Sequence, residues 1–102
     1  MSSILVVHEI STEREEIARA LEGEGFTVVQ ATSAAEAVRE IWGGNFLVAV
    51  ISTLLTGTTS ASLQQQLVQM APEIETLIHG KNDELPKLVR KVVAIRDGEA
   101  AA

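Results

Sequence analysis

The sequence predicts an α/β fold in which one parallel sheet is covered by helices on both faces. Short apolar runs rich in β-branched residues alternate with stretches whose apolar residues recur at helical spacing. The apolar runs are continuous, which is typical of parallel strands buried on both faces. Connections between the runs are short, which favours parallel strands joined by right-handed crossovers. With 102 residues, the chain has room for one small domain.

Four apolar runs are predicted to form the strands, in residues 4–8, 26–31, 46–51 and 74–79. The third run, FLVAVI, is the most apolar, whereas Glu75 interrupts the fourth. Ser52 directly follows the third run, and His8 and His79 end the first and fourth. Because the carboxyl ends of parallel strands meet at one edge of the sheet, these side chains are candidates for a shared site.

Capping boxes are predicted to open the first two helices, at Thr12 with Glu15 and at Ser33 with Glu36. Glycines follow each of these helices and are predicted to end them.

The second half of the chain is predicted to hold two more helices. The third helix follows a polar linker in residues 56–62 and ends before Pro72, because the residue before a proline avoids the helical region. The last helix is predicted over residues 83–95. We expect one domain, residues 1–96, and a flexible C-terminal tail, residues 97–102.

The composition argues against several classes of function. A net charge of −6 argues against a nucleic-acid-binding surface and against binding to an anionic membrane. No apolar run reaches the roughly 20 residues that a membrane helix needs. The absence of cysteine excludes disulfides, thiolate catalysis and cysteine-based metal sites. No basic segment precedes the first apolar run, so we expect no signal peptide and a cytoplasmic protein.

The order and spacing of four stretches carry a resemblance to a known family: ILVVHE, EEIARALEGEGFTVVQATSAAEAV, FLVAVISTLLTG and LVQMAPEIETLI. Together they cover residues 4 to about 80, and the pattern resembles a bacterial response-regulator receiver domain of the CheY-like kind. The resemblance implies a flavodoxin-like fold and a role in two-component signalling.

The resemblance also implies where a phosphorylation site would lie. Receivers bind Mg²⁺ through a pair of acids after the first strand, and this pair falls on His8 and Glu9. The phosphoryl-accepting aspartate falls on Ser52, the Ser/Thr position of the fourth strand falls on His79, and the lysine has no clear counterpart. A serine hydroxyl needs a base before it can attack, and one carboxylate makes a poor Mg²⁺ site. We therefore expect a pseudo-receiver with a vestigial site, without enzyme activity or cofactor.

The chain is also shorter than the resemblance implies. After its fourth strand a receiver continues with a helix, a strand and a helix, whereas one predicted helix remains here. We favour deletion of a helix–strand unit, with the last helix in the role of the final receiver helix. The alternative is that the chain stops after the fourth helix. Deletion leaves a four-stranded sheet, ordered 2-1-3-4, with the fourth strand at an edge.

Other functions of the candidate residues stay open. His8, Glu9, Ser52 and His79 could line a pocket for a small ligand or a transition metal, and the histidines could sense pH. Ser52 with His79 could form a minimal hydrolase, although no G-x-S-x-G motif surrounds the serine. The simpler interpretation is a hydrogen-bonded hydroxyl and two separate polar side chains, and we expect no bound metal.

The leading hypothesis is a signalling module that acts by binding a protein partner. We also expect a homodimer. Loss of a strand would leave the fourth strand exposed, with Leu77 and Ile78 side by side, and proteins cover or pair such edges.

Overall fold

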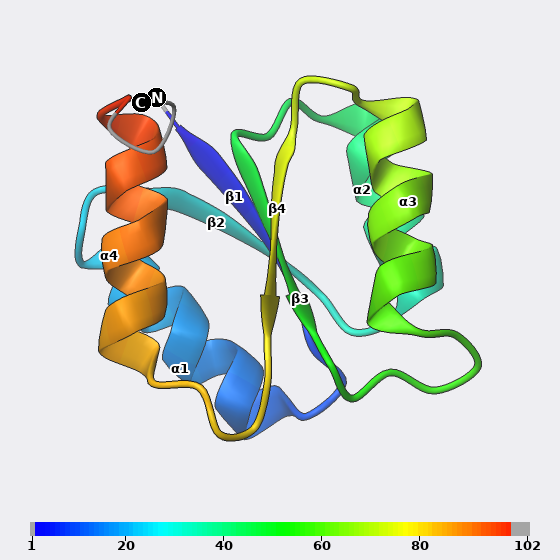
Figure 1. Ribbon diagram of the computed structural model, residues 1–102, viewed down its shortest axis with the longest axis horizontal. Coiled ribbons are helices and arrows are strands. Elements are labelled where there is room, and N and C mark those ends of the chain that lie inside the picture. Colours follow the sequence, from blue (N-terminus) through cyan, green and yellow to red (C-terminus); the bar gives the residue numbers. More distant parts are fainter. Residues whose placement is uncertain (1, 99–102) are drawn as a thin grey trace.

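The computed structural model describes residues 2–98, which form one parallel sheet between two layers of helices (Figure 1). The sheet has the order β2-β1-β3-β4, as the sequence predicted. Its strands are β1 (Ser3–Val7), β2 (Thr27–Ala31), β3 (Val48–Ser52) and β4 (Glu75–His79). The helices are α1 (Ser11–Glu22), α2 (Ala34–Gly43), α3 (Ser60–Met70) and α4 (Leu85–Arg96).

The two faces of the sheet bury separate apolar clusters. Alternate residues of the central strands point to opposite faces, so that Ile4 and Val6 join the cluster under α1 and α4, while Leu5 and Val7 join the cluster under α2 and α3. This two-sided burial is why the strands read as continuous apolar runs. In the part of the chain that the structure describes, no helix is long and apolar enough to cross a membrane.

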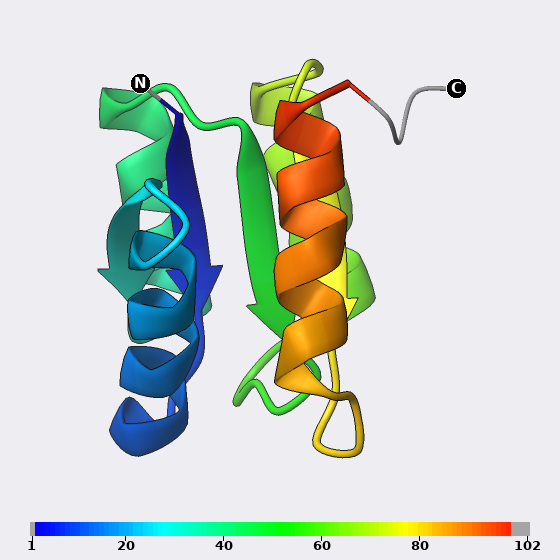
Figure 2. The ribbon, with the colours of Figure 1, turned by 90° about the vertical axis from the view of Figure 1, so that its left-hand side faces the viewer.

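Helix α4 lies beside α1, on the face opposite α2 and α3 (Figures 1 and 2). A right-handed crossover from β4 in the same direction would place a helix on the face of α2 and α3, because the crossovers from β2 to β3 and from β3 to β4 run in that direction and place their helices there. The position of α4 therefore favours the interpretation in which a helix–strand unit is deleted and the last helix returns to pack on α1.

The end of α4 is fixed by Arg96. Its guanidinium lies 4.9 Å from the centre of the Phe26 ring, and its Nη1 donates to the carbonyl of Glu24 at 2.7 Å. Of the predicted tail, only Asp97 and Gly98 are described, and residues 99–102 lie outside the described part.

One of the two predicted capping boxes is confirmed. Ser33 caps α2, with its Oγ accepting from the Glu36 amide at 3.1 Å. The prediction at Thr12 is wrong, because α1 begins one residue earlier, at Ser11, with Ile10 as the extended N-cap and no side-chain cap.

The later helix boundaries also correct the prediction in detail. Helix α3 begins inside the predicted polar linker, because Thr59 Oγ1 accepts from the Ser62 amide at 3.0 Å and caps it. It ends at Met70, as expected from Pro72. Helix α4 begins at Leu85 rather than at Asp83, since the Asp83 carboxylate instead closes the preceding turn by accepting from the Gly80 amide at 2.7 Å.

Candidate functional site

The carboxyl ends of three neighbouring strands bring the predicted site residues to one edge of the sheet. Ser52 ends β3 and is in register with His79 on β4, while Val7, the residue before His8, is in register with Ile51. The sequence thus correctly placed these residues at one edge of the sheet. The hydrogen bonds of each side chain show what this edge can do.

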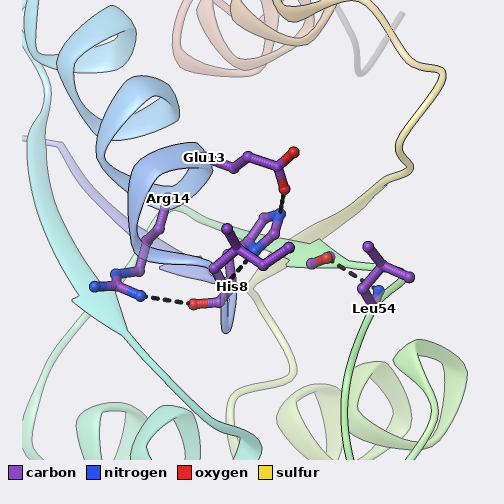
Figure 3. Close-up of polar contacts among 6 residues, drawn as sticks. His8, Glu13, Arg14 and Leu54 are labelled. Atoms are coloured by element: carbon purple, nitrogen blue, oxygen red, sulfur yellow. Dashed lines mark hydrogen bonds and ion pairs between the residues drawn. The ribbon is translucent and has the colours of Figure 1, made fainter.

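Ser52 is a buried strand-end hydroxyl that bonds to its own chain. Its side chain is 3% exposed, and its Oγ accepts from the Leu54 amide at 3.0 Å (Figure 3). This local turn is a common role for serine at the end of a strand. Within residues 2–98, neither histidine is hydrogen-bonded to this hydroxyl, so no base is in place to activate it.

His8 links the end of β1 to the first turn of α1. Its Nδ1 accepts from the Ile10 amide at 3.1 Å, and its Nε2 lies 3.0 Å from Glu13 Oε2 (Figure 3). Because Nδ1 acts as the acceptor, the ring is the neutral tautomer that carries its proton on Nε2. Arg14 Nη1 also donates to the His8 carbonyl at 2.9 Å. Both ring nitrogens therefore already have protein partners.

Burial is the main cause that lowers the pKa of His8 below its ordinary value. The Glu13 carboxylate opposes this effect, whereas electrostatic interaction with Arg14 and with His79 adds to it, and Glu9 makes a smaller contribution in the opposite direction. The side chain is 7% exposed, so a proton on Nδ1 would place a charge away from water.

Glu9 fastens two loops of the site edge to each other. Its two carboxylate oxygens accept from the amide and from the hydroxyl of Thr56, the hydroxyl at 2.7 Å. The bond from the Thr56 amide, followed by the bond from its hydroxyl, lowers the pKa of Glu9.

The four predicted residues do not assemble into a metal centre. Across the described part of the chain, no group of three or more His, Asp or Glu side chains has the geometry to hold a metal ion. The arrangement is instead a set of structural contacts, in which His79 is partly exposed and lines a recess next to α4 with Lys87 and Lys91.

Sequence reasoning missed the partners that hold this edge together. Glu13 and Arg14 of α1 both contact His8. Thr56 was expected to lie in a free polar loop, yet it binds Glu9, which is 47 residues away in the chain. The spacing of residues carries no signal for contacts that depend on the path of a loop.

The similarity to known proteins lies in the structure and not in the sequence. No protein-family model matches the chain. No curated protein matches it either.

Several solved structures with the same fold are response regulators. A response regulator receiver domain protein (CheY-like) from Methanospirillum hungatei JF-1 superposes with a TM-score of 0.88 at 17% identity, covering 99% of this chain and 98% of that one. A two-component response regulator from Clostridium difficile gives 0.82 at 15% identity, covering 95% and 97%. A response regulator from Burkholderia pseudomallei, solved with a phosphorylated aspartic acid, a calcium ion and citrate, gives 0.80 at 17% identity, covering 99% and 72%. The chain therefore has the receiver fold.

Proposed function

We propose that this protein is a receiver-like signalling module that is not phosphorylated and that acts by binding proteins in a two-component or related regulatory pathway in the cytoplasm. The receiver fold supports the signalling role. The proposed module has no enzyme activity and needs no cofactor.

The observation that carries the proposal is Ser52 at the end of β3. The resemblance places the phosphoryl acceptor there, and this side chain is a buried neutral hydroxyl that accepts from Leu54. Phosphoryl transfer also needs a cation held by carboxylates. The acid pair is reduced to Glu9, and both of its oxygens are bound by Thr56.

Exposed apolar surface supports the protein-binding part of the proposal. Trp42, at the end of α2, is 81% exposed and lines a recess with Ile41 and Met70. Large exposed aromatic side chains are common at the centre of protein interfaces. The proposed module is also a homodimer, since β4 is an open sheet edge on which Ile78 is 40% exposed.

Titration with beryllofluoride and Mg²⁺ tests the proposal. We expect the amide resonances of Ser52, Leu54 and Thr56 to stay unchanged, because no carboxylate is available to bind the phosphoryl mimic. Saturable shifts of these resonances, dependent on Mg²⁺, would show a working phosphorylation site.

The alternative, a small-ligand or metal-binding protein that uses His8, Glu9, Ser52 and His79, has less support. The polar side-chain atoms of the first three residues already bind protein groups. Isothermal titration with Mg²⁺ and Zn²⁺ separates the two functions, and stoichiometric binding that His79→Ala abolishes would favour the alternative.

A further inference from the structure

We infer that two copies of this chain join by antiparallel pairing of their β4 strands about Leu77, with Glu75 of each copy opposite His79 of the other. The inference rests on the proposed homodimer and adds its register and its contacts.

The hydrogen bonds of β4 show which of its groups face the open edge. The Glu75 amide donates to the Leu47 carbonyl at 3.1 Å, and the His79 carbonyl accepts from Thr53 at 3.3 Å. Residues alternate in a parallel ladder, so Glu75, Leu77 and His79 bond to β3. Thr76 and Ile78 therefore direct their amides and carbonyls outward, where a further strand would bind them.

The side chains of β4 alternate in the same way between the two faces. Leu77 packs in the cluster under α1 and α4, so Glu75 and His79 share that face. Thr76 lies on the other face, where its Oγ1 accepts from Gln64 Nε2 of α3 at 2.6 Å.

These constraints leave few registers for self-pairing. In an antiparallel pair, the outward-facing residues must lie opposite each other, which permits a two-fold axis at Thr76, Leu77 or Ile78. An axis at Thr76 places Glu75 opposite Leu77, and an axis at Ile78 places His79 opposite Leu77. An axis at Leu77 pairs Leu77 with its own copy and Glu75 with His79. On the face of α1 and α4, only this register pairs the apolar side chains with each other and the polar side chains with each other, while on the other face it places Thr76 opposite Ile78.

The surroundings of His79 suit the incoming carboxylate. His79, Lys87 and Lys91 line the recess between β4 and α4. The acids in the same recess already have partners, since Asp83 accepts from the Gly80 amide and Glu84 lies 3.9 Å from Lys87. Glu75 of the second copy thus meets His79 and Lys91, which lines the recess and has no acid paired with it in the described part of the chain, and its carboxylate accepts from the His79 ring.

The other sheet edge is less suited to self-pairing. On β2, Gln30 is held by Arg14 of α1, whose Nε donates to Gln30 Oε1 at 3.0 Å. Pairing β2 with itself about Val29 would bring no opposite charges together. The match of charges therefore selects β4.

Paired cysteine variants test the register directly, because the chain has no native cysteine. Glu75→Cys and His79→Cys proteins are oxidised mildly, each alone and as an equal mixture. We expect a disulfide dimer in the mixture and little in either variant alone, since directly opposite residues of such a pair lie about 4.5 Å apart at Cα, within disulfide range. A mixture of Gln30→Cys with His79→Cys gives the background level of disulfide formation between cysteines that are not paired. Circular dichroism confirms that each variant is folded.

Sedimentation equilibrium gives the energetic test. Glu75→Lys should weaken the dimer about tenfold or more, because each of the two cross-strand pairs loses its carboxylate acceptor and gains a positive charge beside Lys87 and Lys91 of the other copy, and adding His79→Glu should restore it. Cross-linking at background level in the mixture, with a dimer still present by sedimentation, would overturn the register. A monomer at micromolar concentration would overturn the homodimer and this inference with it. Both results are independent of the beryllofluoride titration, so the phosphorylation proposal stands or fails separately.

Discussion

At the scale of single residues, His8 connects the sheet to the first helix. Its Nδ1 accepts from the amide of Ile10, the N-cap of α1, which is the task that a glutamate performs in a capping box. Protonation of Nδ1 would remove this acceptor and would also place a charge in a buried position. Both effects make protonation unfavourable in the folded protein.

The stability of the protein should therefore depend on pH through His8. Its pKa is lower when folded than its ordinary value of 6.5, so between these two values the unfolded chain binds a proton that the folded chain does not. We expect the free energy of unfolding to keep its full value above about pH 6.5 and to fall as the pH is lowered toward the folded-state pKa.

Urea unfolding at several pH values between 7.5 and 5 measures this dependence. His8→Asn should flatten it, while His79→Asn should retain it at the same protein concentration. An unchanged slope in His8→Asn would show that another group is responsible.

Alanine variants of Ser52 and of its neighbour Ile51 compare how much a hydrogen bond and burial each contribute to the free energy of unfolding. Ser52→Ala removes one acceptor, the partner of the Leu54 amide, and should lower the free energy of unfolding by about 1 kcal/mol. Ile51→Ala should lower it by about 2–5 kcal/mol, because Ile51 is fully buried and a cavity would remain. Urea unfolding compares the two variants, and similar losses of stability would mean that Ser52 does more than close a turn.

At the scale of elements, the strands could be predicted more reliably than the helix starts. Continuous apolar runs located all four strands to within two residues, because burial on both faces leaves a strong pattern. The prediction of a helix start at Ser33 was correct because the hydroxyl of this residue itself caps α2. The prediction at Thr12 was wrong because the N-cap of α1 is Ile10, whose amide bonds to His8 of the preceding segment, and no local motif records that contact.

Contacts between distant segments also limited what could be predicted of the candidate site. The edge where His8, Ser52 and His79 gather follows from strand order and could be predicted. The contact of Glu9 with Thr56 could not, because it depends on how the loop after β3 folds back. Whether a side chain at the edge is free or already bound was the decisive fact for function, and it required the structure.

The docking of α4 should depend on its last turn. Arg96 stacks on Phe26 and bonds to Glu24, so Arg96→Ala should lower the free energy of unfolding by about 1–2 kcal/mol. Arg90, an exposed arginine on the same helix, is the matched control, and its replacement by alanine should cost less than about 0.5 kcal/mol. Equal effects of the two variants in chemical unfolding would remove the proposed role of Arg96.

At the scale of the whole molecule, the fold retains the receiver layers while the site edge is made of structural contacts. The sheet order and both helix layers match solved response regulators. The polar groups at the carboxyl edge, by contrast, bind Leu54, Ile10, Glu13 and Thr56 of the same chain. Under the proposed function, protein binding falls to the surface of the fold, and Trp42 and the β4 edge are exposed features that fit this role.

The most direct test of this account is the intact mass of the protein after incubation with acetyl phosphate and Mg²⁺. The account predicts an unchanged mass, because Ser52 lacks a base and Glu9 is bound by Thr56. Ser52→Ala, treated in parallel, locates any label that does form. A gain of one phosphoryl group that requires Mg²⁺ and disappears in Ser52→Ala would contradict the account.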